Sequence, residues 1–137
     1  MSIEQVKTIN FPEKGDERGT LIVVEGKEDI PFEIKRVFYM LGTDSTKVRG
    51  QHANRDSEFI LVNIAGSSKV KVDDGKGNTK IFILDKPATG LYIPKMIWKD
   101  MYDFSKDSIL MVLSNNHYDE KEYIRNYEDY KKEVNND

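Results

Sequence analysis

The feature that most constrains the fold is a series of short β-branched segments, each bounded by turn residues. The clearest pair lies at 69–72 and 80–84, joined by Asp73-Asp74-Gly75-Lys76-Gly77-Asn78, which has the composition of a hairpin turn. Residues 69–72 alternate polar and apolar side chains, as a half-exposed strand does. Further strand-like segments lie at 21–25, 35–41, 58–64, 91–94, 96–104 and 109–113. Many short strands separated by turns predict an all-β sandwich or barrel.

Only the C-terminus changes its periodicity. Asp119, with Glu122 three residues later, fits a capping box at the start of a helix. Three apolar side chains then recur at helical spacing, namely Ile124, Tyr127 and Tyr130. We therefore expect one C-terminal helix that packs this face against the sheets. Because the 137 residues contain no internal repeat or linker, we expect a single domain over residues 1–137.

Composition and charge exclude several functional classes. A net charge of -3 argues against general nucleic-acid binding, which needs an excess of clustered Lys and Arg. The chain has no cysteine, so disulfides, thiolate metal sites and cysteine nucleophiles are excluded. No apolar run approaches the roughly 18 residues of a membrane span, and the first residues lack a signal-peptide pattern. We expect no nucleic-acid partner, no membrane association and a cytoplasmic location.

The polar stretch from Arg49 to Glu58 is the strongest candidate for a functional site. It concentrates charged and hydrogen-bonding side chains and then passes into an apolar strand. If residues 49–54 are extended, side chains alternate between faces, which would put Arg49 on the face opposite His52 and Asn54. This pattern predicts a polar site walled by a sheet.

His52 is one of only two histidines, and its surroundings allow three interpretations. The spacing to Asn54 and Glu58 resembles the first motif of the cupin superfamily, but metal-binding cupins have a second histidine there and another later. One imidazole and one carboxylate make a weak metal site, so we expect no metal. A structural histidine bonded to the backbone is the second interpretation. General acid–base catalysis is the third, and the neighbouring Arg49, Asn54 and Arg55 favour it.

Other side chains offer binding or proton-transfer chemistry. Arg49 and Arg18 can clamp phosphate through bidentate hydrogen bonds, although Arg18 can equally form a surface ion pair with a neighbouring acid. Tyr39 is either a proton donor or a core aromatic residue. Trp98 is either a stacking platform for a base or sugar, or a buried indole.

Taken together, these residues resemble the sugar 3,4-ketoisomerases, small cupins that act on dTDP-4-keto-6-deoxyglucose. The resemblance covers nearly the whole chain. The matching segments are Asp16-Glu17-Arg18-Gly19-Thr20-Leu21, Ile34-Lys35-Arg36-Val37-Phe38-Tyr39, Val48-Arg49-Gly50-Gln51-His52-Ala53, Lys71-Val72-Asp73-Asp74-Gly75, Gly90-Leu91-Tyr92-Ile93-Pro94, 98–104, His117-Tyr118-Asp119 and Tyr123-Ile124-Arg125.

The resemblance implies a metal-free, cupin-type double-stranded β-helix (jelly roll) that works as a homodimer without a cofactor. Its members move a keto group from carbon 4 to carbon 3 of the hexose through an enediol, in the synthesis of dideoxy-aminosugars for surface polysaccharides. The family motif usually reads Arg-Gly-x-His-Ala-His, with both histidines and a tyrosine of the preceding strand assigned to catalysis. His52 and Tyr39 match, whereas Asn54 replaces the second histidine.

The resemblance also implies a division of roles. His52 would take the carbon-bound proton, Tyr39 would polarise or protonate the oxygen, and Asn54 would donate a hydrogen bond to the enediolate. Four residues are expected to bind the nucleotide sugar, namely Arg49, Arg18, Trp98 and Lys99. Two alternatives remain, a dTDP-sugar 3,5-epimerase of the same fold and a non-catalytic nucleotide-sugar-binding cupin.

Overall fold

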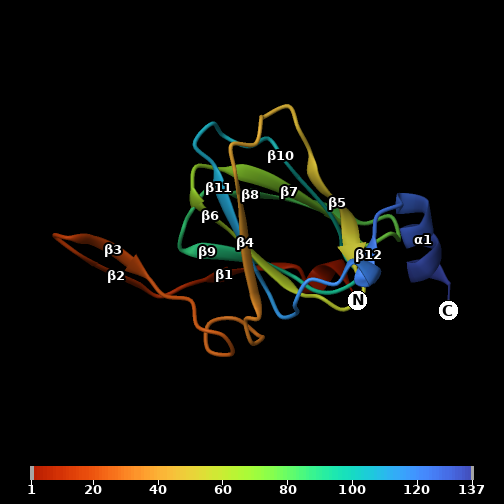
Figure 1. Cartoon of the computed structure of the whole chain (residues 1–137), viewed down its shortest axis with the longest axis horizontal. Coiled ribbons are helices and arrows are strands. Elements are labelled where there is room, and N and C mark those ends of the chain that lie inside the picture. The colour runs from red at the N-terminus through yellow and green to blue at the C-terminus, as the bar shows by residue number, and fades with distance from the viewer. Residues whose placement is uncertain (1, 137) are drawn as a thin grey trace.

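Two five-stranded antiparallel sheets face one another and form the body of the protein (Figure 1). The structure, a computed structural model, describes residues 2–136. The first sheet has the order β1-β9-β6-β11-β4, and its strands are β1 (Lys7–Asn10), β9 (Thr89–Ile93), β6 (Phe59–Ala65), β11 (Ile109–Ser114) and β4 (Arg36–Leu41). The second has the order β12-β5-β10-β7-β8, and its strands are β12 (Tyr123–Ile124), β5 (Arg49–Asn54), β10 (Trp98–Tyr102), β7 (Ser68–Asp73) and β8 (Thr79–Leu84). This arrangement confirms the predicted β-sandwich.

The main core lies between the two sheets and is built from alternate residues of their strands. Phe59 and Leu61 of β6 meet Val70 and Val72 of β7 in one buried cluster. A second cluster covers the outer face of the first sheet, where Ile60 and Val62 pack against residues of the segment 22–34. Because both faces of β6 are covered, its sequence is a continuous apolar run rather than an alternating one.

The N-terminal part contains a short 3₁₀ helix (Ile3–Gln5) and a hairpin that the sequence did not predict. The charged residues and glycines at 14–19 are typical of a turn, but β2 (Glu13–Asp16) pairs with β3 (Gly19–Ile22) in a separate two-stranded sheet. The expected strand at 21–25 therefore begins earlier and ends at Ile22. The hairpin projects away from the body of the molecule (Figure 1), and most of its residues are exposed.

The C-terminal segment forms a second 3₁₀ helix (Glu120–Glu122), then β12, then the helix α1 (Tyr127–Asn135). Asp119 caps the 3₁₀ helix, as its position predicted, but Asn126 caps α1 and Ile124 belongs to β12. Tyr130 anchors α1, because its ring is fully buried and its hydroxyl lies 2.8 Å from the carbonyl oxygen of Met96. Within residues 2–136, no helix is long and apolar enough to cross a membrane.

Candidate active site

A bulge in β5 determines which side chains face the space between the sheets. His52 pairs with Lys99 of β10, whereas Asp100, the next residue of β10, pairs with Gly50. Gln51 is therefore an extra residue in β5. Gly50 and Gln51 both have positive φ, 83° and 56°. A Cβ on Gly50 would lie 2.9 Å from the carbonyl oxygen of Lys99, so this position needs glycine.

The bulge corrects the alternation expected for β5. Arg49 lies opposite Met101, a residue of the core between the sheets. Paired residues on antiparallel strands share a face, so Arg49 lies on the same interior side as His52. Its Nε also donates to the sulfur of Met40 on β4, at 2.9 Å. The prediction that Arg49 faces away from His52 is wrong. The extra residue shifts the alternation, so the residues of β5 before the bulge face the opposite side from the one expected.

His52 is a largely buried imidazole in the candidate site. Its ring centroid lies 4.9 Å from that of Tyr123, and its Nδ1 has no hydrogen-bond partner among the described residues. Burial and, to a lesser extent, the nearby charge of Lys99 together lower the pKa of His52 from 6.5 to about 4. At neutral pH the imidazole is therefore uncharged and able to accept a proton.

Asn54 and Lys99 form a buried polar pair beside His52. Asn54 is 1% exposed and Lys99 is 3% exposed, and Lys99 Nζ donates to Asn54 Oδ1 at 3.3 Å. Burial lowers the pKa of Lys99 from 10.5 to about 7, against the opposing influence of Glu122. Asn54 Nδ2 has no hydrogen-bond partner within residues 2–136, so the two N–H donors of this amide are unused by the protein.

Glu122 supports the end of β5 and was not predicted as a site residue. Its buried carboxylate accepts hydrogen bonds from the backbone N–H groups of Asp56 and Ser57, at 2.9 and 2.8 Å, and from the Ser57 hydroxyl. Burial alone would raise the pKa of Glu122, but these hydrogen bonds outweigh it and lower the pKa. Glu122 is thus an ionised acid whose charge acts on both His52 and Lys99. Its place in a capping-box pattern concealed this role.

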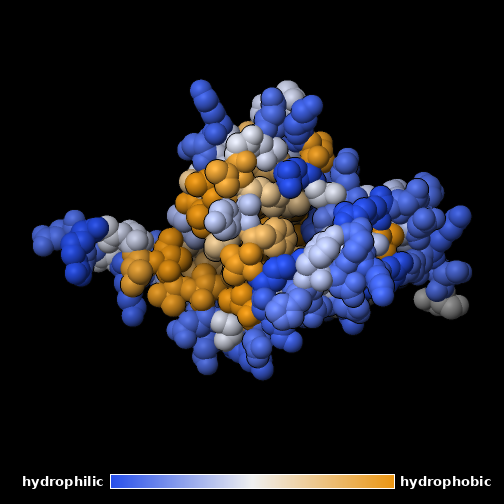
Figure 2. All heavy atoms as spheres, in the orientation of Figure 1, coloured by the Kyte–Doolittle hydropathy of each residue, from blue (hydrophilic) through white to orange (hydrophobic). Residues whose placement is uncertain are grey.

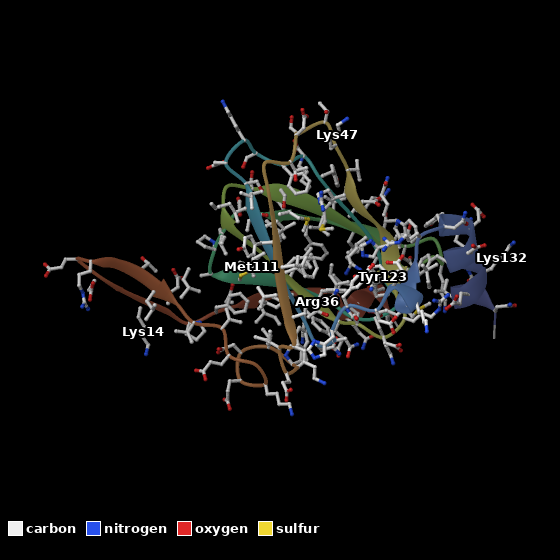
Figure 3. All side chains as sticks on the ribbon, viewed as in Figure 1. Lys14, Arg36, Lys47, Met111, Tyr123 and Lys132 are labelled. Atoms are coloured by element: carbon white, nitrogen blue, oxygen red, sulfur yellow. The ribbon has the colours of Figure 1, made fainter. Side chains whose placement is uncertain are left out.

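Arg36 and Tyr123 also line this region and were not predicted as site residues. Arg36 Nη1 lies 3.4 Å from the Tyr123 hydroxyl (Figure 3). Arg36 alternates with outward-facing residues along β4, whereas Tyr123 lies opposite Asn54 on β12. Both belong to segments that the family resemblance covers, but neither has a sequence pattern that distinguishes a site residue from a core one.

Three predicted site residues lie away from His52. Tyr39 is 63% exposed and belongs to the outward-facing set of β4, so its side chain points away from His52. Trp98 is buried on the outer face of the second sheet against Tyr130, with ring centroids 5.5 Å apart, so it is a packing residue. Arg18 lies in the projecting hairpin, where it pairs with Asp16. The structure therefore brings together His52, Asn54, Lys99 and Arg49, but not Tyr39, Trp98 and Arg18.

The site is basic, and most of its hydrogen-bond donors are cationic. The positive charges of Lys99 and Arg125 act on His52, and Arg36 bonds to its neighbour Tyr123. In residues 2–136, no three His, Asp or Glu side chains come together as metal ligands would. The arrangement offers one neutral base, several cationic donors and one unused amide donor. Such a set suits an anionic substrate and proton transfer at carbon.

Comparison with known proteins places the chain in a family. Residues 4–135 match the family model described as FdtA: WxcM-like, C-terminal. The chain is 44% identical over 128 residues to the TDP-4-oxo-6-deoxy-alpha-D-glucose-3,4-oxoisomerase of Aneurinibacillus thermoaerophilus, covering 93% of this chain and 91% of the relative.

Solved structures agree with this placement. A variant of the 3,4-ketoisomerase QdtA from Thermoanaerobacterium thermosaccharolyticum, in complex with TDP-4-keto-6-deoxyglucose, has a TM-score of 0.94 and 38% identity, over 97% of this chain and 96% of that one. WlaRA, a TDP-fucose-3,4-ketoisomerase from Campylobacter jejuni, has a TM-score of 0.91 and 44% identity, over 96% and 97%. By its sequence match and its fold, the chain belongs to the FdtA-type family of cupin-like sugar 3,4-ketoisomerases.

Proposed function

We propose that the protein is a 3,4-ketoisomerase that converts dTDP-4-keto-6-deoxyglucose into a dTDP-3-keto-6-deoxyhexose. The observation that carries the proposal is His52, an uncharged, largely buried imidazole with an unbonded nitrogen among cationic donors. Relatives at 38–44% identity bear the names of such isomerases, and one was solved with TDP-4-keto-6-deoxyglucose bound. The proposed role for the product is in dideoxy-aminosugar biosynthesis.

The reaction moves protons and electrons within the substrate, so it needs no cofactor. His52 takes the proton from carbon 3, which leaves an enediolate with a double bond between carbons 3 and 4. A proton returns to carbon 4, and the hydroxyl proton of oxygen 3 is transferred to oxygen 4. Carbon 3 becomes the ketone, and carbon 4 becomes the alcohol. Atoms and charge balance with His52 as the only base that the carbon-bound proton requires.

Asn54 is proposed to donate a hydrogen bond to the enediolate. Its Nδ2 is buried and unbonded by protein, and its Oδ1 is already held by Lys99. A donor fixed in this way stabilises developing negative charge without reorganisation. Tyr39 was expected to act on the same oxygen, but its side chain faces away from the site of its own protomer, so that assignment needs another group.

Arg49 is the proposed contact for the diphosphate of the nucleotide, because it lies on the interior side of β5 and forms no ion pair in the described part of the chain. Arg18 lies in the β2–β3 hairpin, which projects away from the body of the molecule (Figure 1), and its side chain pairs there with Asp16. If Arg18 binds substrate, it does so in a partner subunit. A cytoplasmic location remains part of the proposal, and fractionation of producing cells would test it.

A homodimer is proposed because, in the described part of the chain, the first sheet has exposed apolar side chains and an unpaired edge at β4. Val37, Tyr39 and Leu41 of β4 are more than half exposed, and no strand within residues 2–136 pairs with the outer edge of β4. Figure 2 shows apolar residues gathered over the region of β4 and β11 and toward the base of the projecting hairpin. A second copy would cover both the apolar surface and the open edge.

Sedimentation of Leu41→Lys tests the dimer. Leu41 is 63% exposed, so a lysine there should leave the protomer folded but weaken the dimer. Ile83→Lys is the matched control, because Ile83 is 64% exposed on β8 of the other sheet. A wild-type monomer at micromolar concentration would contradict the proposal.

Incubation with dTDP-4-keto-6-deoxyglucose in D₂O, followed by NMR, tests the proposed function. A 3,4-ketoisomerase should incorporate deuterium at carbon 4 of the product. Substrate recovered from the reaction should carry deuterium at carbon 3. A 3,5-epimerase would exchange carbons 3 and 5, and a binding protein would exchange neither. The same spectra would give the configuration at carbon 4.

A further inference from the structure

Arg36 carries a charge into apolar surroundings without an acidic partner. Its guanidinium carbon lies 5.1 Å from the ring centroid of Phe38 and 6.0 Å from that of Phe59. Its Nε and Nη2 are buried and have no hydrogen-bond partner among residues 2–136. Stacking on aromatic rings compensates part of the desolvation of a guanidinium, but two buried N–H donors remain unused. Such a group is arranged to meet an anionic ligand.

Tyr123 joins Arg36 to His52. Tyr123 lies opposite Asn54 across the β12–β5 pair, so its ring shares the face of Asn54 and stands 4.9 Å from the ring of His52. The Tyr123 oxygen accepts the Arg36 Nη1–H at 3.4 Å, which leaves the hydroxyl hydrogen available for a ligand. Figure 3 shows the two labelled side chains in the same part of the interior, although they are 87 residues apart in the sequence.

We propose that the Tyr123 hydroxyl donates a hydrogen bond to the enediolate oxygen, and that Arg36 positions this hydroxyl and stabilises the negative charge. The assignment rests on the proposed ketoisomerase function. A substrate carbon placed at His52 for proton removal carries its oxygen within reach of a side chain in ring contact with His52. Tyr123 keeps its proton, so the balance of the reaction is unchanged. The role expected of Tyr39 thus belongs to a tyrosine 84 positions later in the chain.

The competing role for Arg36 is binding of the diphosphate. The contact with Tyr123 argues for the enediolate, because it places one guanidinium nitrogen against a residue adjacent to the base. The two roles predict different kinetic effects. Loss of a diphosphate contact weakens TDP binding, whereas loss of an enediolate contact lowers kcat and leaves TDP binding nearly unchanged.

Three variants test the assignment, namely Tyr123→Phe, Arg36→Lys and the control Tyr127→Phe. The Tyr127 hydroxyl donates to Asp73 at 2.7 Å in the cluster around Trp98, away from His52, so its loss should leave turnover near the wild-type value. Tyr123→Phe should lower kcat by about 100- to 1,000-fold, as removal of one oxyanion donor does. Arg36→Lys should lower kcat less than Tyr123→Phe, because a lysine retains the charge but not the fork of donors. TDP affinity, measured by calorimetry, should change by less than about twofold in each.

The outcomes separate this assignment from the function on which it rests. Active wild-type protein with normal kcat in Tyr123→Phe would overturn the assignment alone. Normal kcat in Arg36→Lys, with TDP affinity weakened more than about tenfold, would assign Arg36 to the diphosphate and overturn its role here. Wild-type protein without turnover or exchange at carbon 3 would overturn the proposed function and this assignment together. Thermal unfolding of each variant excludes misfolding as the cause of a lost activity.

Discussion

His52 and Lys99 lie directly opposite one another on the antiparallel strands β5 and β10. Both side chains face the interior, where burial disfavours a charge on either and the Lys99 charge opposes protonation of His52. The pair therefore keeps the imidazole uncharged at neutral pH, which a general base acting on a carbon-bound proton requires. This relationship leads to the first prediction.

Replacing Lys99 with methionine should raise the pKa of His52. The change removes a neighbouring positive charge, but burial, the larger cause of the shift, remains, so the pKa should stay below 6.5. NMR titration of the imidazole C–H signals measures this directly, because the chain has only two histidines. Lys71→Met is the control, since Lys71 lies opposite Asp100 on the adjacent strand pair. An unchanged or lower pKa in Lys99→Met would contradict the coupling.

His52 should also make the protein less stable in mild acid. Its pKa is 6.5 before folding and about 4 in the folded protein, so between these values the unfolded chain binds a proton that the folded chain does not. The free energy of unfolding should therefore fall as pH decreases through this window. From pH 7 to pH 5 the loss is about 2 kcal/mol, at about 1.4 kcal/mol per pH unit.

The measurement is urea unfolding of the wild type and of His52→Asn at both pH values. Because the variant lacks the titrating group, it should lose about 2 kcal/mol less than the wild type. His117→Asn should keep the wild-type dependence, since His117 is exposed and outside the site. Parallel losses in the wild type and His52→Asn would show that His52 does not titrate in this window.

The sandwich could be predicted from the sequence because strand periodicity and turn composition are local properties. The segments at 35–41, 58–64 and 80–84 all became strands within a residue or two of the expected bounds. The hairpin around Arg18 was missed, because its charged residues and glycines are also typical of a turn. A projecting hairpin has no apolar face to reveal it.

The candidate site could be predicted only in part, because its geometry depends on non-local pairing. Sequence reasoning identified His52, Asn54 and Lys99, which come together. It could not locate the bulge at Gln51, which decides the face of Arg49, or the outward face of Tyr39. Nor could it bring Tyr123 to His52, since that contact depends on how the last strand pairs with β5. A residue-level motif gives chemistry, whereas register decides which residues share a face.

Replacing Arg49 with alanine should weaken TDP binding. Arg49 lies on the interior side of β5 without an ion pair among the described residues, so its charge is available for the diphosphate. Loss of one charge-assisted hydrogen bond costs about 1.5–3 kcal/mol, or roughly 10- to 150-fold in Kd. Calorimetric titration with TDP checks this. Arg55→Ala is the control, because Arg55 pairs with Glu133 instead. Equal affinities in the wild type and Arg49→Ala would remove Arg49 from the site.

Replacing His52 with asparagine should abolish turnover and leave TDP binding nearly intact. Removal of a general base typically costs about 100- to 10,000-fold in rate. His117→Asn is the matched control, as the chain has no third histidine, and it should turn over normally. The NMR assay with dTDP-4-keto-6-deoxyglucose measures both. Turnover in His52→Asn near the wild-type rate would assign the proton transfer to another group.

Asn54 gives the sharpest test, because its two interpretations predict opposite results. If Asn54 replaces a lost catalytic histidine, Asn54→His should raise turnover toward the level of the family. The structure favours adaptation instead, because Asn54 is 1% exposed and its Oδ1 accepts the Lys99 Nζ–H at 3.3 Å. A larger imidazole at a filled position strains the packing by about 1–3 kcal/mol and displaces that contact.

We therefore expect Asn54→His to be neutral or harmful, and Asn54→Ala to slow turnover by removing the enediolate donor. The rate of product formation and TDP affinity should be measured together, since neither change should affect the nucleotide contacts. Thermal unfolding separates a packing defect from a lost donor. A packing defect lowers the unfolding temperature, whereas loss of the donor lowers kcat per folded molecule. A large gain in turnover from Asn54→His would show that the amide is a lost histidine rather than an adaptation.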